Sequence, residues 1–224
     1  MWYKSLIYFG AECTRRVKIL RYLSDRLTMG DFSFYFKFGW EHIISLDALD
    51  HQLFISALAA IYLLKDWRQV LVLVTAFTIG HSITLALSVY KIISVDPTWT
   101  EFLIPCTIVI TALINFFQKD FSPKSVLINY FLALFFGLIH GLGFANTINM
   151  IKSNDQSFGW SLFAFNVGLE VGQIVVVSLL LLLAELVVNK LKLNRRFWVI
   201  FLSAAVFAVA LKIAIERIPF QNSQ

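Results

Sequence analysis

Residues 160–188 read WSLFAFNVGLEVGQIVVVSLLLLLAELVV, a largely apolar stretch that contains no lysine or arginine. A helix needs about 20 such residues to cross the roughly 30 Å hydrocarbon core of a bilayer. The stretch is long enough to do so, and it therefore predicts a transmembrane helix.

Five further stretches follow the same pattern. The chain of 224 residues is 58% hydrophobic and only 15% charged, with a mean hydropathy of +0.74, whereas a soluble domain of this length needs more polar surface. The connections are too short for a soluble domain. We therefore predict an all-α polytopic membrane protein with about six transmembrane helices in one bundle. The predicted spans are roughly 43–64, 69–91, 101–118, 126–150, 160–188 and 197–215.

Residues 1–28 differ from the rest because they are polar and basic, and their apolar runs are too short to span a membrane. We expect either an amphipathic helix on the membrane surface or a dispensable extension before a start at Met29. Residues 29–224 are expected to form a single transmembrane domain. With residues 1–28 counted, more lysines and arginines lie on the membrane side that holds the N-terminus; without them, more lie on the opposite side. Because loops rich in lysine and arginine tend to face the cytoplasm, the sequence leaves the orientation in the membrane open. No internal repeat is evident in the sequence.

All four histidines lie in or at the edge of the apolar stretches, together with acids and amides. Such groups are costly at bilayer depth and usually serve a function with a partner. No lysine or arginine lies near the middle of a predicted span, so the protein offers no cation of its own to neutralise the acids. The expected partner is a metal ion or protons. The candidate metal ligands are His42, Asp47, Asp50, His51, His81, His140, Asn166 and Glu170.

The first predicted span holds four of these candidates. Asp47 and His51 are four residues apart and would share one face of a helix. His42 precedes His51 by nine residues, which places it on the opposite face of a straight helix. His42 can join the same site only if the helix begins late, kinks or bulges. Otherwise it is a gate at the mouth of the site, or a polar residue at the end of the span.

Two further spans carry one histidine each near the centre. Thr78 lies beside His81 and would either orient its imidazole or bond to another helix. Gly137 and Gly141 allow another helix to approach closely, but close packing does not explain His140 between them.

The fifth span places Asn166, Glu170 and Gln173 on one helix face, and a glutamate at that depth is protonated, paired or bound to a cation. The candidates together offer nitrogen and oxygen ligands. That mixture suits a divalent transition metal such as Ni, Co, Fe, Mn or Zn, and the lack of a Cys/Met cluster argues against Cu(I).

Four motifs in this order resemble those of the HupE/UreJ family of membrane proteins. They are His42 with Asp50-His51-Gln52-Leu53-Phe54, then Phe77–Leu85, Phe136–Ala145 and Phe165–Gln173. The family is associated with nickel and cobalt supply to hydrogenase and urease, as secondary permeases. The resemblance thus implies a set of candidate ligands along a metal path: His42, Asp50, His51, His81 and His140. The interval between His42 and Asp50 is longer here than in the family's pattern.

We therefore expect a metal permease rather than an enzyme, with protonation of a histidine or of Glu170 driving release of the ion. One alternative is an intramembrane zinc-dependent hydrolase of the ceramidase-like type. Others are electron transfer through haem or quinone, and an accessory subunit with a merely structural polar core. The expected partners are a metal ion and the lipid bilayer of the bacterial inner (cytoplasmic) membrane, and no nucleic acid. Association with a second copy of the chain is left open.

Overall fold

The computed structural model describes residues 31–45, 48–118, 126–151 and 158–219. These residues are mostly helical and include no strand, and four of the helices are long and apolar enough to cross a membrane. The predicted all-α class and helical membrane bundle are thus confirmed. The helices are α2 (Asp31–Ile44), α3 (Leu49–Ala59), α4 (Trp67–Val89), α5 (Pro97–Phe117), α6 (Val126–Ile151), α7 (Phe158–Glu185) and α8 (Arg195–Glu216). A 3-10 turn (Leu64–Asp66) precedes α4, and a π-helical turn (Leu186–Lys190) follows α7.

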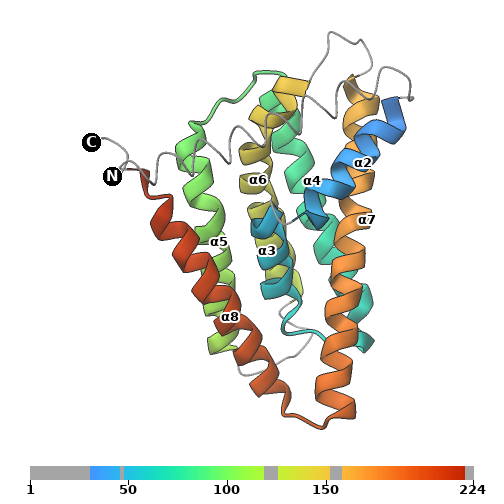
Figure 1. Cartoon of the computed structure of the whole chain (residues 1–224), viewed down its shortest axis with the longest axis vertical. Coiled ribbons are helices and arrows are strands. Elements are labelled where there is room, and N and C mark those ends of the chain that lie inside the picture. The colour runs from blue at the N-terminus through green and yellow to red at the C-terminus, as the bar shows by residue number, and fades with distance from the viewer. Residues whose placement is uncertain (1–30, 46–47, 119–125, 152–157, 220–224) are drawn as a thin grey trace.

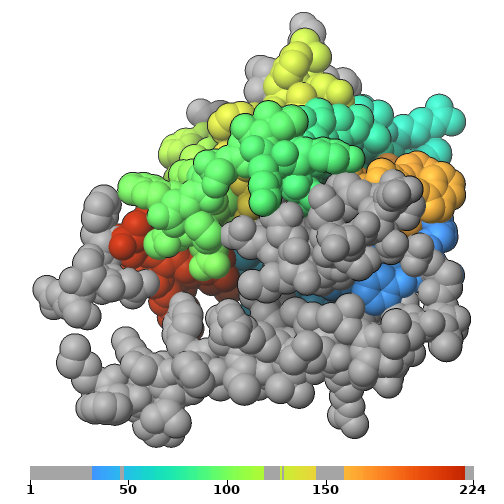
Figure 2. All heavy atoms as spheres, turned by 90° about the horizontal axis from the view of Figure 1, so that it is seen from above, coloured from blue at the N-terminus to red at the C-terminus, as the bar shows by residue number. Residues whose placement is uncertain are grey.

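The helices run up and down the long axis of the molecule (Figure 1). Helices α2 and α3 together lead downward in that view, α4 returns upward, and α5 to α8 continue to alternate. Figure 2 looks along this axis and shows α5 and α8 on one side, with α2 and α7 on the opposite side. Within the described residues the helices therefore alternate in direction along the bundle, with α2 and α3 sharing the first direction. Four of them, α4, α5, α7 and α8, are long and apolar enough to span a membrane.

The prediction of one continuous first span over residues 43–64 is wrong. The chain leaves helical geometry after α2 and enters a second helix, α3, at Leu49. The last carbonyl groups of a helix have no partner within it, and at membrane depth each must find one. The side-chain nitrogen Nε2 of Gln52 supplies it, donating to the carbonyl oxygens of Ile43 (3.0 Å), Ile44 (3.2 Å) and Ser45 (3.1 Å).

Two helix pairs, α2 with α7 and α4 with α6, are in backbone contact through glycines. A Cβ atom on Gly39 in α2 would overlap the carbonyl oxygen of Phe165 in α7. A Cβ atom on Gly137 in α6 would overlap the carbonyl oxygen of Phe77 in α4. Small residues permit this close approach in membrane bundles. The glycines thus allow the backbones of both pairs to pack directly against each other.

Helices α5 and α8 close the bundle on the other side. The buried side chain of Asn115 in α5 donates to the carbonyl oxygen of Ala57 (2.7 Å) and to Oγ of Ser203 (3.1 Å). One amide thus joins α3, α5 and α8.

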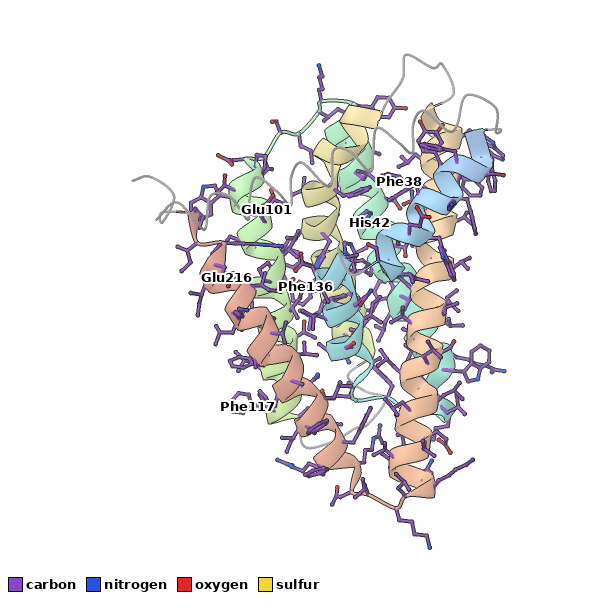
Figure 3. All side chains as sticks on the ribbon, viewed as in Figure 1. Phe38, His42, Glu101, Phe117, Phe136 and Glu216 are labelled. Atoms are coloured by element: carbon purple, nitrogen blue, oxygen red, sulfur yellow. The ribbon has the colours of Figure 1, made fainter. Side chains whose placement is uncertain are left out.

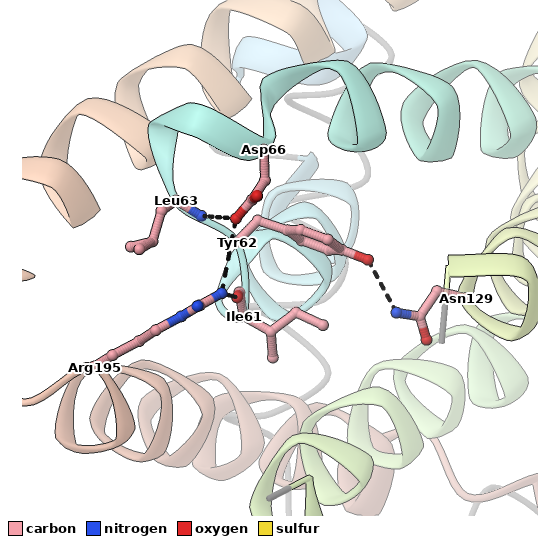
Figure 4. A network of polar contacts seen from close by, with 6 residues as sticks. All are labelled: Ile61, Tyr62, Leu63, Asp66, Asn129 and Arg195. Atoms are coloured by element: carbon pink, nitrogen blue, oxygen red, sulfur yellow. Dashed lines mark hydrogen bonds and ion pairs between the residues drawn. The ribbon is translucent and has the colours of Figure 1, made fainter. Parts of the chain in front are cut away.

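A polar network ties the lower end of the bundle together (Figure 4). The guanidinium of Arg195, at the start of α8, donates to the carbonyl oxygen of Ile61 and lies 3.7 Å from Oδ2 of Asp66. Beside it, the side-chain nitrogen of Asn129 in α6 donates to the Tyr62 hydroxyl (3.0 Å). The segment between α3 and α4 is therefore bonded to both α8 and α6.

Candidate metal site

The four histidines meet in the interior of the bundle, although each belongs to a different helix. Their ring centroids are 4.6 Å apart for His42 and His51, 5.2 Å for His51 and His140, and 5.8 Å for His51 and His81. The rings of His42 and His81 are 6.2 Å apart. His51, His81 and His140 are buried, and His42 is partly buried. The site therefore gathers α2, α3, α4 and α6 around one cluster of imidazoles.

The division of the first span brings His42 and His51 together. In a straight helix the two side chains would point to opposite faces, but the break between α2 and α3 turns their rings toward each other. Of the roles that the sequence left open for His42, the structure supports membership of the cluster.

Three of the imidazoles lie close enough together to hold a metal ion. One ring nitrogen from each of His42, His51 and His81 can be chosen so that all three lie within 4.8 Å of one another. Metal–nitrogen bonds of about 2.0–2.1 Å in tetrahedral geometry place ligand nitrogens about 3.3 Å apart. A small inward movement of the rings would thus suffice to coordinate one ion.

Several ring nitrogens in the cluster are buried and make no hydrogen bond within the described part of the chain. They are Nε2 of His51, both nitrogens of His81, and Nε2 of His140. Nδ1 of His140 lies 2.8 Å from the carbonyl oxygen of Phe136, so Nδ1 carries the proton and Nε2 keeps its lone pair. A buried polar group without a partner costs about 1–3 kcal/mol. A bound cation would compensate that cost at several nitrogens at once.

Phenylalanine rings form the walls of the site. The ring centroid of Phe144 lies 3.9 Å from that of His42, and that of Phe165 lies 5.9 Å from it. On the other side, the rings of Phe77 and Phe54 lie 5.1 Å and 5.4 Å from that of His140. Apolar walls limit the access of water to the imidazoles.

The expectation that the acids have no cation of the protein to neutralise them is wrong for Asp50. Nη1 of Arg217, which follows α8, donates to Oδ2 of Asp50 at 2.9 Å. The second oxygen, Oδ1, is buried without a hydrogen-bond partner among the described residues. Asp50 therefore forms an ion pair at the edge of the cluster, and the group of three ligands contains no carboxylate.

Two of the three polar side chains that were expected to share one face of α7 bond to α4. Oε1 of Glu170 accepts a hydrogen bond from the Thr75 hydroxyl (2.7 Å), and Oε1 of Gln173 accepts one from the Thr78 hydroxyl (2.8 Å). Oδ1 of Asn166 is buried and has no hydrogen-bond partner in the described part of the chain. Thr78 thus bonds to α7 rather than to an imidazole, while Asn166 keeps a free acceptor oxygen.

Two predicted features lie outside the described residues, namely Asp47 and the basic segment 1–28. Two functional residues were missed from the sequence. Gln52 directly follows the Asp50-His51 pair, and an amide at that depth is itself a signal of a bonding role. Arg217 lies beyond the predicted end of the last span, and no local pattern links it to a residue in the first span.

Comparison of the sequence with models of known protein families gives a match to one family. A family model described as HupE / UreJ protein matches residues 20–217, which is most of the chain and includes every predicted ligand. No match is found among curated proteins, and none is found among solved structures.

Proposed function

The chain belongs to the HupE/UreJ family, which suggests a function related to nickel or cobalt transport, and we propose that it is a secondary permease for a divalent transition-metal ion such as Ni²⁺ or Co²⁺. The main support is the group of His42, His51 and His81, whose ligand nitrogens lie within 4.8 Å of one another inside the bundle. Imidazole is a preferred ligand of nickel and of neighbouring first-row metals.

The other predicted ligands have different roles in this proposal. His140 supplies a fourth nitrogen, because its Nε2 lone pair is buried beside His51. Asn166 adds an oxygen ligand through its buried Oδ1. Asp50 holds Arg217 and thereby fixes the start of α3. Asp47, outside the described residues, remains a predicted ligand.

Release of the ion is proposed to depend on protons. A metal ion and a proton compete for the same imidazole nitrogen, so protonation of the cluster expels the ion. Glu170 is the carboxylate on α7 closest in sequence to Asn166 and is bonded to the Thr75 hydroxyl of α4. We assign Glu170 to proton exchange rather than to the ion itself.

The alternative of an intramembrane zinc hydrolase has less support. Such an enzyme needs a water molecule on the metal and a general base beside it. Asp50, the acid at the edge of the cluster, is already paired with Arg217. The family match also favours transport, and we do not propose the hydrolase.

Metal content tests the proposal. Detergent-purified wild type, His51→Ala and His81→Ala would be incubated with Ni, Co, Fe, Mn, Zn or Cu and analysed by inductively coupled plasma mass spectrometry. Loss of a residue that only orients a ligand lowers metal affinity by about 10–100-fold, so loss of a ligand should lower it further. We expect exchangeable binding in the wild type and none in either variant.

Thr107→Val is the matched control. Thr107 is buried in α5 and bonds to the carbonyl oxygen of Ile104 (2.7 Å), away from the cluster. Its variant should bind metal as the wild type does. Equal binding by wild type and His51→Ala would contradict the proposed ligands, and stoichiometric zinc that resists exchange would favour the hydrolase.

A further inference from the structure

The two helix pairs that meet through glycines share a sequence pattern. Helix α2 contains Phe38-Gly39-Trp40-Glu41-His42 and α6 contains Phe136-Gly137-Leu138-Ile139-His140, so both carry Phe-Gly-x-x-His. Helix α4 contains Phe77-Thr78-Ile79-Gly80 and α7 contains Phe165-Asn166-Val167-Gly168, so both carry Phe-x-x-Gly. Each pair, α2 with α7 and α4 with α6, therefore combines one copy of each pattern.

The backbone contacts repeat as well. A Cβ atom on the Phe-x-x-Gly glycine would meet the same two atoms of the facing helix in both pairs. These are the carbonyl oxygen of the residue three positions before the Phe-Gly glycine and the amide nitrogen of the residue directly after it. The contacts join Gly168 to Phe36 and Trp40, and Gly80 to Leu134 and Leu138. The two pairs thus share one interface, atom by atom.

The two copies of this interface point in opposite directions. Helices α2 and α7 run downward in Figure 1, whereas α4 and α6 run upward. The two helix pairs are therefore related by an approximate two-fold axis across the bundle, in the manner of an inverted repeat, with α2 equivalent to α6 and α4 equivalent to α7. The sequence analysis found no repeat because the shared residues are few and become recognisable only through these contacts.

The shared patterns place two pairs of equivalent phenylalanines on the two sides of the histidines, and each side has one further phenylalanine without a counterpart. The upper layer consists of Phe38, Phe144 and Phe165, and the lower layer of Phe54, Phe77 and Phe136. Ring centroids within the upper layer are 5.2–5.8 Å apart, and in the lower layer the ring of Phe54 lies 4.8 Å and 5.8 Å from its two neighbours. Figure 3 shows Phe38 above His42 and Phe136 below it.

A small cavity borders the lower layer at Phe136. This cavity, of about 20 Å³, has a largely apolar lining that includes three polar side chains. The lining residues are Leu58, Ile61, Ile114, Leu132 and Phe136, with Thr111, Asn115 and Asn129. Its size is enough for one water molecule, and its amides and hydroxyl offer hydrogen bonds. Three polar side chains thus lie behind Phe136 in an otherwise apolar lining, and one of them, Asn129, also donates to the Tyr62 hydroxyl.

We propose that the two phenylalanine layers are the two gates of the permease and that they open in turn. This inference rests on the proposed transport function. In permeases built from inverted repeats, the site lies where the repeats meet and is exposed to one side at a time as one repeat moves against the other. Phe38 in the upper gate is equivalent to Phe136 in the lower gate, and Phe165 is equivalent to Phe77. Each gate closes the histidine cluster from its own side.

Thiol labelling at the cluster tests the gates without using metal. The reporter is His81→Cys in a chain that also carries Cys13→Ser and Cys106→Ser, reconstituted in one orientation in lipid vesicles. A charged, membrane-impermeant methanethiosulfonate reagent is applied from either side. Because alanine leaves a large space in place of a packed phenylalanine, Phe38→Ala should raise the labelling rate from the upper side by about ten-fold or more. Phe136→Ala should do the same from the lower side only.

Three comparisons make the outcome decisive. Phe165→Ala should raise labelling from the upper side only, and Phe77→Ala from the lower side only. These two variants keep the test valid if Phe38→Ala or Phe136→Ala fails to fold. Phe201→Ala, on a residue of α8 that is 61% exposed, should change neither rate. Labelling that rises from the same side in Phe38→Ala and Phe136→Ala, or in neither, would overturn the gates. Sided labelling, together with a wild-type protein that binds none of the metals, would keep the gates and reject the cargo.

Discussion

Replacing Asp50 or Arg217 by alanine distinguishes a structural ion pair from a metal ligand. Nη1 of Arg217 and Oδ2 of Asp50 are 2.9 Å apart, and the two side chains are 31% and 17% exposed. At that distance two unit charges attract by about 6 kcal/mol in an effective dielectric of about 20. Removing both groups from water offsets most of that attraction, and partial exposure screens it further. We expect a net coupling of about 1–2 kcal/mol.

The two single variants should be more destabilised than this coupling, because each leaves one charge partly buried without its partner. We expect each to lower the free energy of unfolding by about 2–3 kcal/mol. The double variant should lose less than the two single variants together. Thermal unfolding of all four proteins in detergent measures the difference, at about 2–4 °C for each kcal/mol.

Metal content on the same samples gives the second readout. We expect both Asp50→Ala and Arg217→Ala to retain exchangeable metal, because the pair lies at the edge of the histidine cluster. Lys212→Ala is the control, since Lys212 forms an exposed pair with Glu216 at 4.0 Å near the same end of α8 and should have little effect. The reasoning is refuted if the two effects on stability are additive, or if Asp50→Ala alone loses the metal.

Two further predictions concern the packing of the bundle. Gly168→Ala should lower stability by about 1–3 kcal/mol, because its Cβ atom would overlap the backbone of Phe36. Gly159→Ala, with open space around it, should not, and equal thermal unfolding of the two variants would contradict this. Arg195→Met should lower stability by about 1–2 kcal/mol, because it removes the pairing with Asp66 and the bond to a backbone carbonyl. An unchanged unfolding temperature would show that the contacts of Arg195 do not stabilise the bundle.

The helical membrane bundle was predictable from the sequence because apolar length and the scarcity of charge follow from the bilayer itself. The histidines were predictable as a group for the same reason. The break in the first span was not, because it depends on Gln52 reaching back to three carbonyl groups, and hydropathy does not register such a contact. The partner of Asp50 was missed because Arg217 lies at the far end of the chain. Only the folded arrangement joins them.

The divided first span also changes what the spacing of its motif means. Within one helix, each inserted residue rotates everything beyond it by about 100°, so two ligands tolerate few changes of interval. Because α2 and α3 are separate helices, a residue inserted between them does not rotate α3 about the axis of α2. A longer connection is accommodated as long as Gln52 still reaches the carbonyl groups at the end of α2. The extended interval between His42 and Asp50 is thus compatible with an intact cluster. Relatives of this protein are better sought by the two flanking segments than by a fixed distance between them.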